Sequence, residues 1–269
     1  MSRLRPAVGR AARRPRPQRH RSAVGRPGRA ADAPGGQVNG AKRIDLGALL
    51  ERWGTSIDGE LLVLALTHRS FANTVGGPHN ERLEFLGDSV LSLVAADYFY
   101  REQPGLAEGQ ISRLHHATVS EPTLAALARR LDLGDYLLLD QAADGYGARA
   151  QDSVLADAVE ALIGATYLCH GYDATARVVR SLLDEVFADA PRLAFLQDPK
   201  TPLQEWAVKH GYSHPVYASQ HTGPDHARVF AATVSLDGKV YGRGSGTSRK
   251  AAEVQAAAEA CARLGVDGK

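Results

Sequence analysis

The stretch that decides the fold is Asn80-Glu81-Arg82-Leu83-Glu84-Phe85-Leu86-Gly87-Asp88-Ser89-Val90-Leu91. Its apolar residues recur at three- and four-residue steps, which predicts an α-helix. At roughly 100° per residue, the predicted core stripe consists of Leu83, Leu86, Val90, Leu93 and Val94. The carboxylates of Glu81, Glu84 and Asp88 fall together on a separate strip. Acids stacked at this spacing repel one another, so a compensating group is expected beside them.

A second acidic helix is predicted over residues 153–164, Ser153-Val154-Leu155-Ala156-Asp157-Ala158-Val159-Glu160-Ala161-Leu162-Ile163-Gly164. Asp157 and Glu160 lie one turn apart, and nearly all their neighbours are apolar or small. A helix that is apolar all round is normally buried. Unpaired carboxylates in such a place are costly or are forced into the neutral form.

Two pairs of carboxylates at helical spacing suit Mg²⁺, which takes a few carboxylate ligands and keeps water and substrate phosphate in its octahedron. With a second ion about 3.5–4 Å away, such a site can activate water and stabilise the leaving oxygen of a phosphodiester. The alternative is that each acid is a solvated surface charge. That alternative suffices for the first helix alone, but the apolar surroundings of the second helix argue against it. The spacing by itself does not name the reaction.

Charge is distributed unevenly over the 269 residues, although the net charge is only +2. Residues 1–43 hold 11 Arg and one Lys against Asp32 alone, whereas residues 44–197 hold 22 acidic and 11 basic side chains. The first segment lacks large apolar residues, so it is predicted to be a disordered basic tail that adds salt-sensitive nucleic-acid affinity. A transit peptide or an over-extended gene start remain alternatives for this segment.

Cysteine usage and hydropathy restrict the class of protein. Cys169 and Cys261 are the only cysteines and have no CxxC spacing. A disulfide framework and a cysteine-rich zinc site are therefore excluded, and a reducing, cytoplasmic location is expected. No run of about 18 apolar residues is present, so no membrane partner is expected.

The period of the apolar residues divides the chain into two domains. It is helical over residues 44–190, which predicts an all-α domain, and residues 191–200 with Asp198-Pro199 are predicted to be a linker. Residues 201–267 are predicted to form a compact α-β-β-β-α domain. Its expected elements are a helix at 202–210, strands at 216–220, 229–236 and 239–242, a hairpin turn at Asp237-Gly238, and a helix from the N-cap Ser248 to about Leu264.

These motifs resemble the bacterial ribonuclease III family. Residues 80–91 match the family's nine-residue signature, Leu155-Ala156-Asp157-Ala158-Val159-Glu160-Ala161 matches its second acidic helix, and Ala65-Leu66-Thr67-His68-Arg69-Ser70 matches an upstream motif. The resemblance covers residues 46–264. It implies a homodimeric endonuclease, dependent on Mg²⁺ with Mn²⁺ able to substitute, that cuts double-stranded RNA. The implied products carry 5′-phosphates, 3′-hydroxyls and short 3′ overhangs, and the implied substrates include ribosomal RNA precursors and structured messenger RNAs.

The resemblance also implies roles for individual residues. The metal would be surrounded by Glu84, Asp88, Asp157 and Glu160, with Asp88 and Glu160 most critical for the chemistry. Glu81 and Glu108 match further family acids and are expected to support catalysis or contact RNA. Phe85 lies off the core stripe and is expected at the dimer interface, with burial under a neighbouring loop as the alternative.

Two positions depart from the family pattern. His115 stands where many relatives carry Arg or Lys, and Gln151 stands where the G-x-R-x-K-x-S pattern has Lys. Both departures remove fixed positive charge near the expected RNA path, so they affect expected phosphate affinity rather than metal binding.

The C-terminal segment resembles a double-stranded RNA-binding domain, a module that reads the shape of A-form RNA across two minor grooves. The residues expected to contact RNA are Gln204, Glu205, His226, Arg249 and Lys250. Arg249 and Lys250 open a helix, where cations oppose the helix dipole and an external anion is favoured. Glu253 stands where stronger binders often have a third Lys, so modest affinity is expected.

Two other classes of function compete with the endonuclease. One is a catalytically silent RNA-binding relative, which the intact acids argue against. The other is a structural helical protein whose end domain mediates protein contacts, which Arg249, Lys250 and His226 disfavour.

Overall fold

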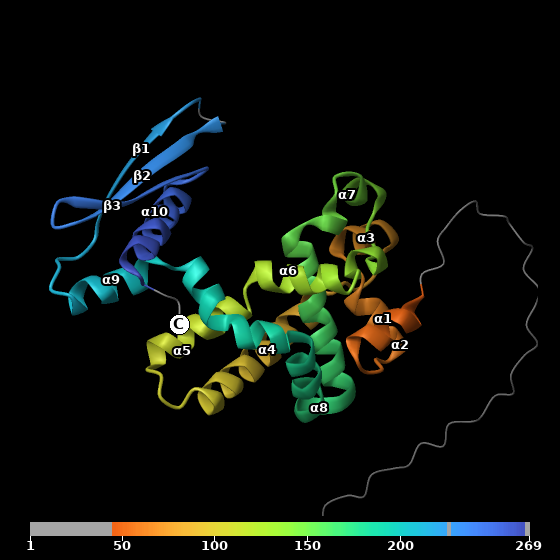
Figure 1. The fold of residues 1–269 in the computed structure, drawn as a ribbon. Coiled ribbons are helices and arrows are strands. Elements are labelled where there is room, and N and C mark those ends of the chain that lie inside the picture. The colour runs from red at the N-terminus through yellow and green to blue at the C-terminus, as the bar shows by residue number, and fades with distance from the viewer. Residues whose placement is uncertain (1–44, 225–226, 267–269) are drawn as a thin grey trace, which may run out of the picture. The chain divides into compact units, whose positions relative to one another are not determined.

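A computed structural model describes residues 45–224 and 227–266 of the chain. The predicted basic tail and His226 lie outside these residues. The described residues form a helical unit followed by a three-stranded sheet flanked by helices (Figure 1), as the apolar periodicity predicted. Within these ranges, no helix combines the length and the hydropathy needed to cross a membrane.

The helical unit is built around one pair of long helices. Its helices are α1 (Leu46–Trp53), α2 (Gly59–Ala65), α3 (Arg69–Val75), α4 (Glu81–Glu102), α5 (Glu108–Thr118), α6 (Glu121–Arg130), α7 (Gln141–Gly145) and α8 (Asp152–Gln197). Short 3₁₀ turns occur at Leu133–Tyr136 and Ala148–Ala150. The core lies where α4, α5 and α6 pack against α8, and its largest fully buried side chains include Trp53, Phe99 and Leu162. Burying this apolar face is what holds the helices together.

The buried face of α4 differs from the predicted stripe at one position. Leu83, Val90 and Val94 are buried as predicted, but Leu93 is 55% exposed. Gly87 and Leu91 occupy the buried face in its place. Because α4 packs against α8 on one side and α5 on another, its buried face is set by those neighbours rather than by the apolar pattern alone.

Helix α8 is longer than the sequence predicts. Its backbone breaks at Gly171 (φ 72°, ψ −177°), a conformation that glycine adopts readily, and then continues to Gln197. Residues 191–197, predicted as part of the linker, are therefore helical, and only Asp198 and Pro199 lie between α8 and the next helix, which begins at Lys200. Burial of Ala190 and Ala194 on either side of Pro191 holds this last segment in the helix. Packing has overridden the helix-breaking preference of proline.

The second unit has the predicted α-β-β-β-α order. It comprises α9 (Lys200–Lys209), β1 (Val216–Thr222), β2 (Val229–Leu236), β3 (Lys239–Gly246) and α10 (Arg249–Leu264), with the strands antiparallel in the order β1-β2-β3. The turn at Asp237-Gly238 has positive φ at both residues (46° and 81°), as a tight hairpin requires. Ser248 caps α10, because its hydroxyl accepts the Ala251 N–H at 3.1 Å.

Small residues let α10 lie directly on the sheet. Ala252, Ala256 and Ala260 of α10 are fully buried against the sheet. A Cβ atom added to Gly242 or Gly244 of β3 would collide with the backbone of α10. The alanine-rich face of this helix is therefore structural, and the functional candidates lie at its N-terminal end.

Candidate active site

The two acidic helices cross at a pair of glycines. A Cβ atom on Gly87 of α4 would overlap the carbonyl oxygen of Glu160, and one on Gly164 of α8 would overlap the carbonyl oxygen of Leu83. Only glycine at both positions permits this backbone approach. The crossing therefore places the acids of one helix beside those of the other.

Three of the four predicted metal-site carboxylates meet at this crossing. One carboxylate oxygen from each of Glu84, Asp157 and Glu160 lies within 4.8 Å of the other two. All three side chains are half-buried. Asp88, one turn beyond Glu84, is exposed and is not a member of this triad. We call Glu84, Asp157 and Glu160 the carboxylate triad.

The triad is electrostatically unfavourable when its members are ionised. Burial raises the pKa of Glu160 to about 8, and the nearby charges of Asp88, Asp157 and Glu84 add to the effect. Burial likewise raises the pKa of Glu84, with Asp157 the next contribution. Burial also raises the pKa of Asp157, and the charge of Glu121 adds to it. Asp88 therefore acts on Glu160 through space although its oxygens lie outside the triad.

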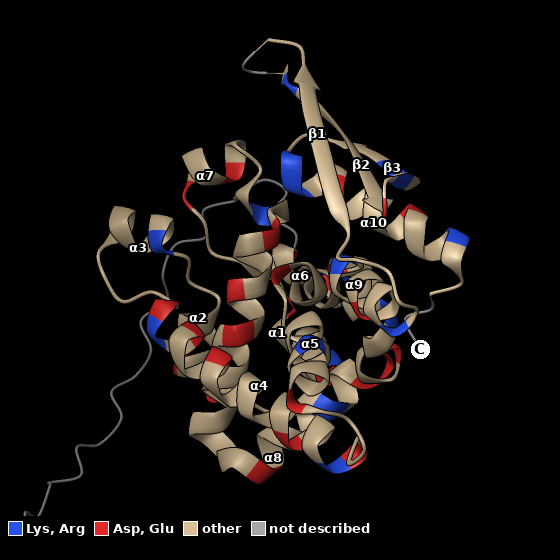
Figure 2. Ribbon diagram, turned by 90° about the vertical axis from the view of Figure 1, so that its left-hand side faces the viewer, with Lys and Arg blue, Asp and Glu red and all other residues tan. Residues whose placement is uncertain are grey.

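The donor set of the triad fits a hard divalent cation. Carboxylate oxygens are the protein ligands that Mg²⁺ and Mn²⁺ prefer. A cation would relieve both the desolvation and the repulsion that raise the pKa values of these acids. Figure 2 shows acidic positions on several turns of the helices around α4.

A polar cavity of about 560 Å³ adjoins the triad. Glu84 and Asp157 form part of its wall, together with His68, Arg69, Asn80, Glu81, Ala143, Tyr146, Ala148, Gln151, Ser153 and Val154. Glu81 lies here rather than in the triad, with its carboxylate 3.8 Å from the Arg69 guanidinium. Arg69, which sequence reasoning did not select, is the only Arg or Lys that the described part of the chain contributes to this wall. The sequence feature that could have identified Arg69 is its position in the Ala65–Ser70 motif.

The remaining residues predicted from the helical unit lie in different surroundings. Glu108 begins α5, is exposed and is not in the triad. Gln151 is exposed at the N-terminal end of α8 and lines the cavity. His115 donates from Nε2 to the Ser92 carbonyl at 3.1 Å, so it ties α5 to α4.

An exposed apolar strip runs along α4 beside the acids. Phe85 is 77% exposed, and Leu93 and Tyr100 follow it on the same side of the helix at 55% and 76%. Large apolar side chains gathered on an exposed surface mark a contact site. The alternative expectation, that a neighbouring loop buries Phe85, is wrong, because the side chain is exposed.

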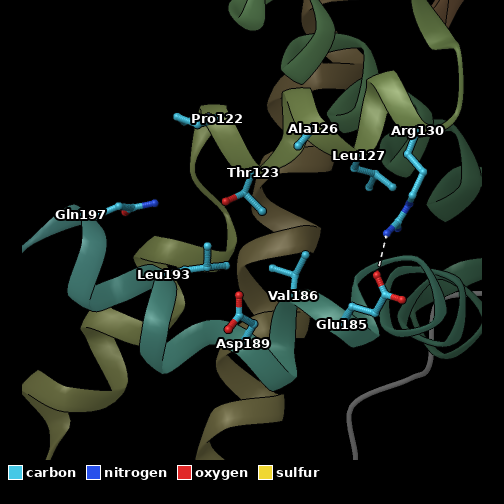
Figure 3. Close-up of a pocket in the computed structure, with 10 residues that line it drawn as sticks. All are labelled: Pro122, Thr123, Ala126, Leu127, Arg130, Glu185, Val186, Asp189, Leu193 and Gln197. Carbon is cyan, nitrogen blue, oxygen red and sulfur yellow. Dashed lines mark hydrogen bonds and ion pairs between the residues drawn. The ribbon is translucent and has the colours of Figure 1, made fainter. Parts of the chain in front are cut away.

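A second hollow, shown in Figure 3, offers no comparable chemistry. It has a volume of about 460 Å³ and lies between α6 and the C-terminal half of α8. Its charged groups are paired, with Arg130 3.4 Å from Glu185 and Asp189 2.6 Å from Arg192. It shares no residue with the triad.

The second unit presents its predicted contact residues on the surface. Gln204, Glu205, Arg249 and Lys250 are all exposed, the first two on α9 and the last two at the start of α10. His226 lies outside the described residues. The contacts that hold Arg249 in place were not predicted from sequence.

Comparison with known proteins agrees with this arrangement. Residues 58–186 match the family model described as ribonuclease-III-like, and residues 199–264 match the double-stranded RNA binding motif. The chain is 49% identical over 221 residues to Ribonuclease 3 of Leifsonia xyli, covering 82% of this chain and 93% of that one. It is 47% identical over 214 residues to Ribonuclease 3 of Streptomyces coelicolor, covering 79% and 78%.

A solved structure matches the helical unit. The nuclease domain of ribonuclease III from Campylobacter jejuni aligns with a TM-score of 0.51 at 36% identity, over 54% of this chain and 99% of that domain. A helical nuclease domain followed by a double-stranded RNA-binding domain defines an endoribonuclease that acts on double-stranded RNA. The chain belongs to the ribonuclease III family.

Proposed function

We propose that the chain hydrolyses phosphodiesters of double-stranded RNA with Mg²⁺, or Mn²⁺ in its place, held by Glu84, Asp88, Asp157 and Glu160. The observation that carries the proposal is the triad, in which three oxygens from α4 and α8 come within 4.8 Å. Asp88 would complete the ligand set from the exposed side, because it already contributes to the raised pKa of Glu160.

The proposed chemistry leaves a 5′-phosphate and a 3′-hydroxyl, with short 3′ overhangs on a duplex. The bound ions would generate the attacking hydroxide and neutralise charge on the leaving oxygen. The chain's own residues would hold and orient the ion. Glu84 and Asp157 would bind it from one side, while Glu160 must release its proton before it can bind the ion. Arg69 is placed to meet a phosphate beside the scissile one, because it lines the adjoining cavity.

We further propose that the enzyme acts as a homodimer through the strip of Phe85, Leu93 and Tyr100. The exposure of these three side chains supports a partner surface, and a two-fold axis is the commonest way to cover such a strip. The nuclease domain of ribonuclease III from Campylobacter jejuni has a region involved in dimer formation. Two sites related in this way would cut one strand each, which accounts for a staggered product.

Recruitment of the duplex is assigned to Gln204, Glu205, Arg249 and Lys250, and also to His226, which lies outside the described residues. Exposure of the four described residues supports contact with ribose hydroxyls and phosphates. Ribosomal RNA precursors and structured messenger RNAs in the cytoplasm are the proposed substrates, because the resemblance to the ribonuclease III family implies them.

Metal dependence tests the proposed function directly. A long RNA duplex is incubated with the protein and Mg²⁺, with Mn²⁺, and with EDTA. We expect cleavage with either metal and none with EDTA, while filter retention of the intact duplex persists in EDTA. Cleavage in EDTA would contradict the metal proposal, and retention without cleavage in Mg²⁺ would favour a silent RNA-binding protein.

A further inference from the structure

A polar network joins the first turns of both helices of the second unit to the sheet. Lys200 begins α9, Ser219 lies in β1, and Arg249 and Glu253 lie one turn apart in α10. Lys200 Nζ donates to Glu253 Oε2 at 2.7 Å. Arg249 Nε donates to Ser219 Oγ at 2.8 Å and lies 4.0 Å from Glu253 Oε1. Glu253 therefore contacts a cation on each helix.

The members of this network differ in exposure. The Glu253 side chain is only 18% exposed, whereas the Arg249 side chain is 71% exposed. Lys200 is held on its other side by the Tyr217 ring, whose centroid lies 4.1 Å from Nζ. Glu253 is thus more buried than the two cations that it contacts, and Arg249 faces solvent. Both contacts of Arg249 use Nε, so its two Nη groups are not engaged by them.

The Arg249 guanidinium, held at this position, is preorganised to bind a phosphate. Arg249 is the first residue of α10, where a cation opposes the helix dipole and an external anion compensates it. An arginine whose fork is held before binding loses less side-chain entropy when it contacts a phosphate. Ser219 and Glu253 supply that restraint from the sheet and from the next turn of the helix.

We propose that Glu253 is a positioning residue for RNA: it orients Arg249 for contact with the phosphate backbone. The proposal rests on RNA binding by the second unit, which is part of the proposed function. It reverses the expectation drawn from sequence, in which Glu253 merely weakens affinity by replacing a lysine.

The two interpretations predict opposite signs. If Glu253 acts only as a negative charge near a polyanion, Glu253→Gln tightens duplex binding. If Glu253 positions Arg249, the same substitution weakens binding although it removes a repulsive charge. We expect weakening of about 3- to 10-fold, the usual size of coupling between contacting groups.

The experiment measures affinity of the full chain for a fluorescent RNA duplex by anisotropy in EDTA, which prevents cleavage. Glu259→Gln is the matched control, because it removes the same charge from the same helix two turns further on, where Glu259 pairs with Arg263 and accepts the Arg243 N–H at 2.8 Å. The control is expected to bind at least as tightly as the parent protein. Binding by Glu253→Gln equal to or tighter than the parent overturns the proposal.

A double-mutant cycle separates positioning from a loss of folding. In an Arg249→Ala background, Glu253→Gln should no longer weaken binding, because the group it positions is gone. A purely structural defect would weaken binding in both backgrounds and would overturn the proposal. Ser219→Ala, which removes the other restraint on Arg249 without changing charge, should weaken binding by about 2- to 5-fold. If the parent protein itself does not retain duplex, the proposed function fails rather than this inference.

Discussion

The α4–α8 crossing and the start of α10 both concentrate charge, but in opposite ways. At the crossing, Glu84, Asp157 and Glu160 gather with their pKa values raised, and none of them has a basic partner among the ion pairs of the described residues. At the start of α10, Glu253 lies between Lys200 and Arg249. Like charges held together require a ligand of opposite sign, whereas paired charges hold one another in place. The arrangement at the crossing is suited to bind a metal cation, and the arrangement at the start of α10 is suited to orient the cationic side chain of Arg249.

The largest expected effect comes from neutralising a member of the triad. Glu160→Gln should lower the cleavage rate by at least about 100-fold, because loss of even an outer partner of a metal ligand typically costs 10- to 100-fold. Duplex retention should be unchanged, because Lys200 of α9 and Arg249 of α10 are untouched. Gel-based cleavage and anisotropy measure the two properties. Equal loss of both would show that Glu160 is mainly structural and would break the comparison.

The next effect tests whether the glycine crossing creates the triad. Gly87→Ala places a Cβ against the Glu160 carbonyl, so α4 and α8 must separate. We expect a loss of about 3 kcal/mol in the free energy of unfolding, measured by urea denaturation. Gly109→Ala in α5 is the control, because open space surrounds its Cβ and alanine favours a helix by about 0.5–1 kcal/mol. Equal stability of the two variants would refute the role of the crossing.

A smaller effect is expected at the apolar strip. Phe85→Ala should weaken self-association by about 30-fold, corresponding to roughly 2 kcal/mol for a central aromatic, and sedimentation velocity over a concentration series measures it. Tyr146→Ala is the control, since Tyr146 is also highly exposed, at 87%, but lies outside the strip. An unchanged dissociation constant for Phe85→Ala would exclude the strip as the dimer contact.

The smallest effect is a pH dependence. Because burial and neighbouring acids raise the pKa of Glu160 to about 8, the metal-free protein carries a proton that Mg²⁺ must displace. Affinity for Mg²⁺ should rise with pH by up to about tenfold per unit below pH 8 and level off above it. Calorimetry in two buffers of different ionisation enthalpy detects the released proton.

The same pKa shift fixes the sign of a stability change in EDTA. The unfolded chain releases the Glu160 proton near its ordinary pKa, and the folded chain retains it up to about pH 8. Stability therefore declines as pH rises between these values. Glu160→Gln should remove that decline, and a decline of equal size in both proteins would contradict the assignment to Glu160.

Local patterns predicted more of the second unit than of the first. The hairpin at Asp237-Gly238, the N-cap Ser248 and the limits of α10 depend on neighbouring residues, and the structure confirms them. The exposure of Leu93 and the continuation of α8 past Pro191 depend on packing between distant segments. No periodicity within one segment carries that information.

The sequence by itself determined that two acidic helices and an α-β-β-β-α module exist, because helical spacing and turn chemistry are local properties of the chain. Only the tertiary structure decided that Glu84, Asp157 and Glu160 meet while Asp88 lies outside the triad, and that Glu253 contacts Lys200 and Arg249. The physical reason is that such meetings depend on how closely two backbones approach. Here Gly87 and Gly164 set that distance for the acids, and the packing of α10 on β3 sets it for the cations.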